Sequence, residues 1–184
     1  MNKKFVFPEI PTGKKWVTDP EGNIYYQVIS TRLTGKQWIP YLGEKEHQIT
    51  DPAKNVLLRH ATESPREGVI YKIVVRPGYL FDADDRFTST FRQYGAARGC
   101  QTPHWQVACL TRELFTNKEL HEMGLNWIMP MHDPITNSKG EPYMLYTGMI
   151  GLSSTDWRSN LFARHDEPFD RFNYACGGFG YLIP

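Results

Sequence analysis

The sequence has no long apolar run, no paired cysteines and no excess of one charge, and each absence excludes a class of protein. A membrane-spanning helix needs about 18 consecutive apolar residues, and no such run is present. The opening MNKKFVFPEI begins with charge but lacks the apolar core of a signal peptide. We therefore expect a cytoplasmic protein that has no membrane partner.

Cysteine is scarce, with Cys100, Cys109 and Cys176 as its three occurrences. The number is odd and no Cys-x-x-Cys pair is present, so we expect free thiols in a reducing compartment and no cofactor. A nucleophilic cysteine would need a histidine beside it in space, and His104 lies between the first two cysteines. We interpret the thiols as core or incidental side chains.

The charges are balanced, because 21 Lys and Arg face 20 Asp and Glu, for a net charge of +1. A dedicated nucleic-acid binder usually carries a strong basic excess, so we do not expect one, although a local basic face would still allow it. The one basic cluster is Lys3, Lys4, Lys14 and Lys15. We interpret it as a solvated surface.

The composition is that of one globular domain. Hydrophobic residues make up 40% of the 184 residues, which is enough for a core. Aromatic residues reach 14%, and 15 Gly with 13 Pro favour many strands and turns over long helices. We expect an extended N-terminal arm over residues 1–22, followed by a single α+β domain over residues 23–184.

Two segments predict strands. Ile24, Tyr26 and Val28 alternate along residues 24–31 and should share one face of a strand. Residues 69–75 are β-branched and aromatic on both faces, which predicts a central strand. By contrast, we expect TGKQWIPYLG, residues 34–43, to form a turn and a short extended piece.

Three segments predict short helices. Asp51 followed by Pro52 is a helix start, and the segment FTSTFRQYGAARG places aromatic residues on one helical face. Thr116 with Glu119 three residues later forms a capping box, and Gly124 suits the position after the helix end.

The last 60 or so residues predict an antiparallel meander. NWIMPMH and PYMLYTGMIGL are extended runs joined by a turn, and two further strands follow. Pro130 lacks a ladder donor, so the first run should be an edge strand or contain a bulge. The fold class we expect is α+β: a mostly antiparallel sheet, two or three short helices and a C-terminal β-meander.

The pair His132-Asp133 is the first candidate for chemistry. A histidine beside a carboxylate suggests general acid–base catalysis, and His104 could join from another segment. However, adjacent residues of a strand point to opposite faces, so the pair is no dyad by itself. His-Glu-x-x-His is absent because Leu125 occupies the place of the second histidine.

The acidic run FDADDRF is the candidate metal site, with Asp82, Asp84 and Asp85 as oxygen ligands. The calcium-loop pattern fails because Phe87 stands where glycine is required. The alternative is a solvated turn that caps a following helix. We expect no bound metal.

Arginine and aromatic residues recur together, and these types are enriched at protein–protein contacts. The residues that we expect at an interface are Phe5, Phe7, Trp16, Arg92, Trp157, Arg164 and Arg171. The alternative is that the arginine stems cover the edges of the core.

Two functions follow. We predict a non-enzymatic interaction or structural protein, a subunit or accessory factor of a larger assembly that binds a protein partner or itself. A phage-derived protein would fit this description. The alternative is a small hydrolase or transferase in which His104 and His132 act with an acid from residues 82–85.

Overall fold

The computed structural model describes residues 3–59, 66–151, 157–168 and 175–184, and for residues 150, 151 and 157 it describes the backbone alone. Within these residues a single sheet holds nine strands. They are β1 (Trp16–Thr18), β2 (Ile24–Ile29), β3 (Gln48–Ile49), β4 (Ile70–Pro77), β5 (Trp127–Pro130), β6 (Ile135–Thr136), β7 (Pro142–Gly151), β8 (Trp157–His165) and β9 (Gly177–Ile183).

The strand order is β1-β2-β4-β9-β5-β7-β8-β3, with β6 paired to β7. The pairs β5–β9 and β3–β8 are parallel, and the others are antiparallel. The predicted mostly antiparallel α+β fold is therefore confirmed. The meander holds from β5 through β8, but β9 then pairs between β4 and β5 instead of extending beyond β8.

The described residues form five α-helices, more than the two or three that we expected. They are α1 (Gly35–Glu44), α2 (Asp51–Arg59), α3 (Thr88–Ala96), α4 (Gln106–Leu114) and α5 (Asn117–Glu122). Two 3₁₀ turns, η1 (Gly78–Leu80) and η2 (Ala83–Asp85), lead into α3. None of the helices in the described part of the chain is long and apolar enough to cross a membrane.

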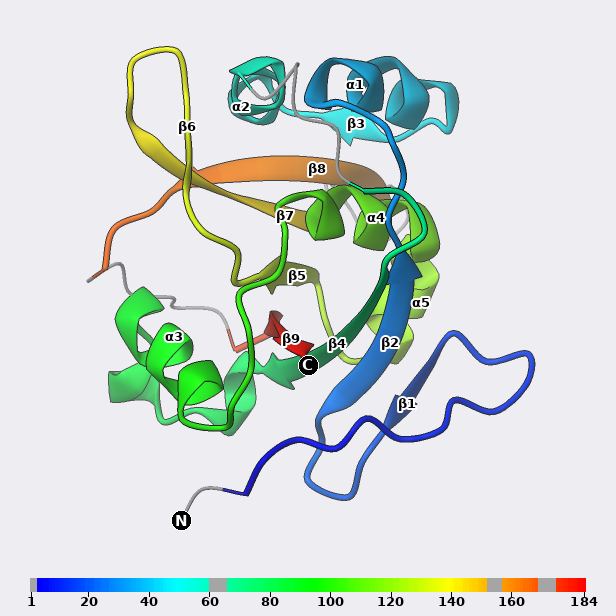
Figure 1. Ribbon diagram of the computed structural model, residues 1–184, viewed down its shortest axis with the longest axis vertical. Coiled ribbons are helices and arrows are strands. Elements are labelled where there is room, and N and C mark those ends of the chain that lie inside the picture. Colours follow the sequence, from blue (N-terminus) through cyan, green and yellow to red (C-terminus); the bar gives the residue numbers. More distant parts are fainter. Residues whose placement is uncertain (1–2, 60–65, 152–156, 169–174) are drawn as a thin grey trace.

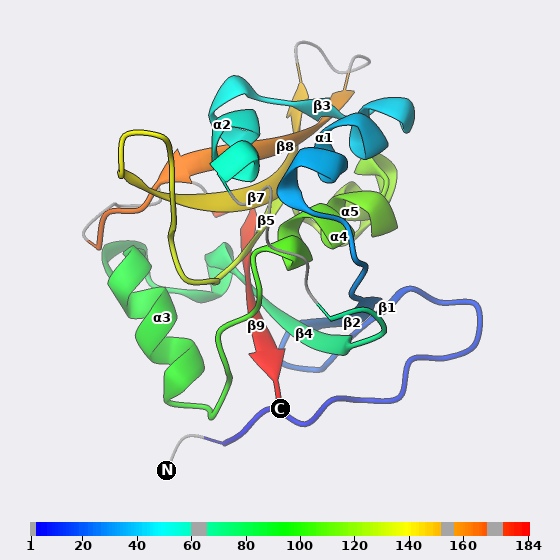
Figure 2. The same ribbon diagram turned by 45° about the horizontal axis from the view of Figure 1, so that its top comes forward.

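The sheet has two differently covered faces (Figures 1 and 2). Helices α1, α2, α4 and α5 cover one face, which we call the helical face. Helix α3 and the N-terminal segment cover the other, which we call the arm face. We use the term arm for residues 3–15. Strand β1 falls inside the expected arm of residues 1–22 and pairs with β2.

Strand β2 shows how the sequence pattern positions both cores. Ile24, Tyr26 and Val28 share the helical face, as predicted from their alternation. Tyr25 is buried on the arm face, where it lies opposite Val74 of β4. Strand β4 is buried on both faces and has β2 and β9 as neighbours, so the prediction of a central strand is confirmed.

Helix α1 corrects the prediction of a turn over residues 34–43. The glycines and Pro40 suggested a break, but Thr34 and Gln37 form a capping box that starts the helix. Trp38 and Leu42, one helical turn apart, are buried in the core of the helical face. Because Pro40 removes only one backbone donor, this burial outweighs its cost.

Two predicted local signals are confirmed in α5 and at its end. Thr116 accepts a hydrogen bond from the Glu119 N–H, and the Glu119 side chain accepts one from the Thr116 N–H. Gly124 has φ of 74°, the left-handed conformation that glycine adopts without steric cost.

Candidate functional site

His132 occupies a position that Pro130 creates. Of the two predicted alternatives, an edge strand or a bulge, the first is wrong, because β5 is an interior strand; its ladder with β7 ends at Ile128. The next N–H of β7 that points to this side belongs to Leu145, and it donates to His132 Nε2 over 2.9 Å. The imidazole ring therefore replaces the ladder acceptor that the departing strand no longer supplies.

The second ring nitrogen fixes the tautomer. His132 Nδ1 lies 2.6 Å from the Asp133 carbonyl oxygen, which can only accept, so Nδ1 carries the proton. The ring is fully buried, and burial lowers the pKa of His132 to about 4. Both nitrogens are thus bonded to backbone in the neutral form, and Asp133 contributes its carbonyl oxygen. This geometry favours a structural role over a catalytic dyad.

The other candidates for chemistry lie on separate elements. His104 precedes α4, and its Nδ1 accepts a hydrogen bond from the Gln106 N–H over 3.2 Å. Asp82, Asp84 and Asp85 are exposed around η2, where the Asp85 N–H donates to the Asp82 carbonyl over 3.0 Å. The described residues contain no cluster of three or more side chains suited to a metal ion.

The three cysteines are free thiols. Burial raises the pKa of Cys100 to about 11 and raises that of Cys109 further. A thiol with a raised pKa is a poor nucleophile at neutral pH because little thiolate is present. These environments match the interpretation of Cys100 and Cys109 as incidental or core side chains.

The aromatic residues of the arm are anchored to the chain's own sheet. Phe5 lies against Tyr25 and Tyr94, with ring centroids 6.4 and 6.2 Å apart, and Phe7 lies 6.1 Å from Tyr25. Trp16, at the start of β1, packs edge-on against Phe115 at 5.9 Å. These three predicted interface residues therefore make contacts within the chain, where Phe5 and Phe7 hold the arm and Trp16 holds β1 in place.

The arginines predicted at an interface have different outcomes. Arg92 donates to the His132 carbonyl over 3.1 Å and pairs with Asp166 over 3.2 Å, so it is bonded within the chain. Arg164 lies partly buried on β8. Arg171 and the side chain of Trp157 lie outside the described residues.

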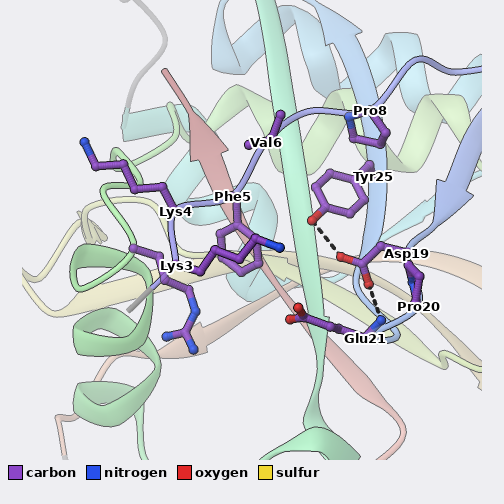
Figure 3. A pocket seen from close by; sticks show the side chains of 10 residues that line it. Lys3, Lys4, Phe5, Val6, Pro8, Asp19, Pro20, Glu21 and Tyr25 are labelled. Carbon is purple, nitrogen blue, oxygen red and sulfur yellow. Dashed lines mark hydrogen bonds between the residues drawn. The ribbon is translucent and has the colours of Figure 1, made fainter. Parts of the chain in front are cut away.

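A pocket of about 320 Å³ lies between the arm and the turn that joins β1 to β2 (Figure 3). Its lining includes Lys3 and Lys4 of the arm and Arg98, which follows α3. Asp19 and Glu21 of the turn lie across from them. We call this the arm pocket.

The Asp19 carboxylate accepts hydrogen bonds from its own turn and from the start of β2. Its carboxylate accepts hydrogen bonds from the Glu21 and Asn23 N–H groups, from the Asn23 side chain and from the Tyr25 hydroxyl, over 2.8–2.9 Å. Burial raises the pKa of Asp19, but the hydrogen bonds from Asn23 and Tyr25 outweigh it and hold this pKa below its ordinary value. The carboxylate therefore organises the turn, and Glu21 is the remaining acid of the arm pocket.

A second pocket, of about 270 Å³, lies beside α3 and is lined by Arg92, Cys100, Asp133 and Tyr181 among others. It gathers a cation, a thiol, a carboxylate and a phenol. Arg92 is already paired with Asp166, and the raised pKa keeps Cys100 protonated at neutral pH. The lining thus offers a polar cavity without an activated nucleophile.

Arg112 is a structural residue that the sequence did not reveal. It is fully buried in α4 and donates to the carbonyls of Phe115 and Gly148 and to the Asn117 side chain. These bonds join the end of α4, the start of α5 and β7. Burial lowers the pKa of Arg112 to about 10, so it stays charged at neutral pH. The available signal was its place in the last helical turn, where a cation meets free carbonyls.

Comparisons of the chain with models of protein families, with curated proteins and with solved structures find no match.

Proposed function

We propose that this protein is a non-enzymatic interaction protein, a subunit or accessory factor of a larger assembly that binds a protein partner through its arm face. The observation that carries the proposal is the exposure of Val6 (76%), Ile29 (56%) and Ile70 (54%). They are three of the five most exposed large apolar side chains in the described part of the chain.

Two of these side chains form one continuous apolar unit. Ile29 ends β2 and Ile70 begins β4, and the two lie directly opposite each other in the antiparallel ladder. They continue the row that begins with Tyr25 and Val74 on the arm face, beyond the part that the arm covers. Burying one isoleucine side chain contributes about 1.5–3 kcal/mol, so a partner that covers both gains a useful share of its affinity.

The enzymatic alternative receives no support from the described geometry. His132 has both ring nitrogens bonded to backbone, and Cys100 and Cys109 have raised pKa values. An acid–base catalyst needs a titratable group within reach of a substrate proton, and His132 is fully buried. The interaction proposal accounts for the exposed isoleucines, which the enzymatic one leaves unexplained.

The test uses affinity capture from lysate of the source cells together with light scattering at micromolar concentration. The Ile29→Thr/Ile70→Thr variant keeps β-branched residues in both strands while removing apolar surface. The matched control is Leu58→Gln, because Leu58 is 52% exposed on α2, on the helical face. We expect the double variant to lose a partner that the wild type and the control retain. A monomer that captures nothing, or three identical capture profiles, would refute the proposal.

A further inference from the structure

We infer that the partner segment bound at the arm face is an extended stretch that alternates acidic and apolar residues. This inference rests on the proposed function and specifies its ligand. We call the surface concerned the arm surface, and its members are Lys3, Lys4, Val6, Ile29, Ile70, Lys72 and Arg98. It combines the three exposed apolar side chains with four cations.

The cations flank the arm where it crosses the sheet. The Arg98 guanidinium lies 5.8 Å from the centre of the Phe5 ring, and Lys72 Nζ lies 5.6 Å from that of Phe7. Lys4 runs past Gly99, where an added Cβ would lie 3.4 Å from Lys4 Cε. The basic groups therefore border the same stretch of arm that presents Val6 to solvent.

The positive charge of this surface exceeds the negative charge beside it. Across residues 3–59, 66–151, 157–168 and 175–184, no ion pair involves Lys3, Lys4, Lys72 or Arg98. Asp19 bonds only to neutral donors and keeps its charge, so Asp19 and Glu21 of the arm pocket set two negative charges against the four cations of the arm surface. A partner that brings carboxylates improves the electrostatic complementarity.

The spacing of the groups indicates an extended ligand. Ile70 and Lys72 are two residues apart in β4 and share one face, which places them about 6.6 Å apart along the strand. Lys4 and Val6 repeat the two-residue spacing in the arm, where the intervening Phe5 packs inward. An extended segment has the same period of two, so alternating acidic and apolar side chains match both pairs.

The positive charge of the arm surface also favours this peptide over a second copy of the chain as the bound partner. A two-fold dimer through this surface would bring two sets of cations into one interface, and like charges brought together are unfavourable. Nucleic acid would satisfy the cations but would not bury Ile29 and Ile70. A peptide with both kinds of side chain uses every group of the surface.

The experiment measures fluorescence anisotropy with a labelled peptide of about 12 residues that alternates Glu and Leu. The comparison probes replace Glu by Lys, replace Leu by Ser, or are a single-stranded DNA of similar length. The test variant is Lys4→Glu/Lys72→Glu, and the matched control is Lys36→Glu/Lys139→Glu, which reverses two exposed lysines elsewhere. Circular dichroism verifies that both variants fold.

We expect the Glu–Leu peptide to bind the wild type, and reversal at Lys4 and Lys72 to weaken it by about tenfold or more. The control variant should stay within about twofold, and raising NaCl from about 50 to about 300 mM should weaken binding. Equal binding of the Leu-to-Ser peptide, no effect of charge reversal, or preference for DNA would overturn the inference. If the isoleucine-dependent partner is still captured while the peptide fails, the proposed function stands and this inference alone falls.

Discussion

The two faces of the sheet are covered in different ways. The helical face carries four helices over a core of aliphatic and aromatic residues, and the buried Arg112 joins two of them to β7. The arm face carries α3 and an arm held by aromatic contacts, and it leaves Ile29 and Ile70 exposed. We infer that the helical face supplies most of the stability, because a cover with few buried groups, such as the arm, can be opened locally.

Removing the Arg112 side chain, which joins α4, α5 and β7, should have the largest effect on stability. Arg112→Ala removes the side-chain donor to two buried carbonyls and to the half-buried Asn117 side chain and opens a cavity, so we expect a loss of about 4 kcal/mol in the free energy of unfolding. Urea denaturation measures it. The control is Arg32→Ala, because the Arg32–Glu67 pair is exposed and should contribute less than about 1 kcal/mol. Equal losses of stability in the two variants would contradict this structural role of Arg112.

Acid should destabilise the fold through His132, which bonds the end of β5 to β7. Its pKa is about 4 in the folded chain and 6.5 in the unfolded chain, so above pH 6.5 neither state binds the proton. As the pH falls from 6.5 to about 4, His132 binds a proton in the unfolded state but not in the folded state. The free energy of unfolding therefore falls by about 1.4 kcal/mol per pH unit.

Thermal unfolding across this pH window measures the His132 effect. The comparison variant is His132→Gln, whose side-chain oxygen can still accept from the Leu145 N–H without titrating. The wild type should lose about 3 kcal/mol more than this variant between pH 7 and pH 4. His47, whose half-buried ring also has its pKa lowered to about 4, supplies a background common to both. Parallel pH profiles would show that His132 is not the titrating group.

Alanine substitutions at two glycines, one in a helix on each face, compare how closely the helix packs at that position. A Cβ on Gly95 of α3 would lie 2.4 Å from the Tyr181 ring, whereas one on Gly43 of α1 would meet nothing within 4 Å. Alanine gains about 1 kcal/mol of helix propensity at either position. At Gly95 the steric cost of about 1–3 kcal/mol outweighs that gain. Chemical denaturation should show Gly95→Ala destabilised and Gly43→Ala stabilised, and the opposite order would mean that α3 is loosely packed.

Releasing the arm should act mainly on local opening and have a small effect on global stability. In Phe5→Ala/Phe7→Ala the arm loses its ring contacts with Tyr25 and Tyr94, at an expected cost of about 1–2 kcal/mol. Trypsin should then cleave among the arm lysines about tenfold faster, because local opening exposes the backbone. Unchanged cleavage, or collapse of the whole fold, would show that arm and domain are not separable in this way.

The features that the sequence predicted correctly depend on nearby residues. The alternation of Ile24, Tyr26 and Val28 and the capping box of Thr116 and Glu119 need only a few positions to be recognised. Helix α1 was predictable from its own capping box, but Gly43 and Pro40 suggested a break. The error arose because tertiary burial of Trp38 outweighed the local propensity.

The candidate site was harder to predict because it depends on contacts between distant segments. The sequence placed Phe5, Phe7 and Trp16 at an interface, yet only the structure shows that their rings pack against other residues of the same chain. Ile29 and Ile70 were assigned to strands without any sign that the pair would remain exposed. Exposure depends on what packs above a residue, and strand periodicity does not report that.

The sequence by itself determined the class of fold, the central strand β4 and the short helices with local caps, because propensity, alternation and capping act over a few residues. Only the tertiary structure decided that β9 lies between β4 and β5, that Leu145 takes His132 as its ladder acceptor, and that Lys72 lies beside the Ile29–Ile70 pair on the arm face. These pairings join residues far apart in the chain, and their free energy comes from burial that exists only once the segments meet.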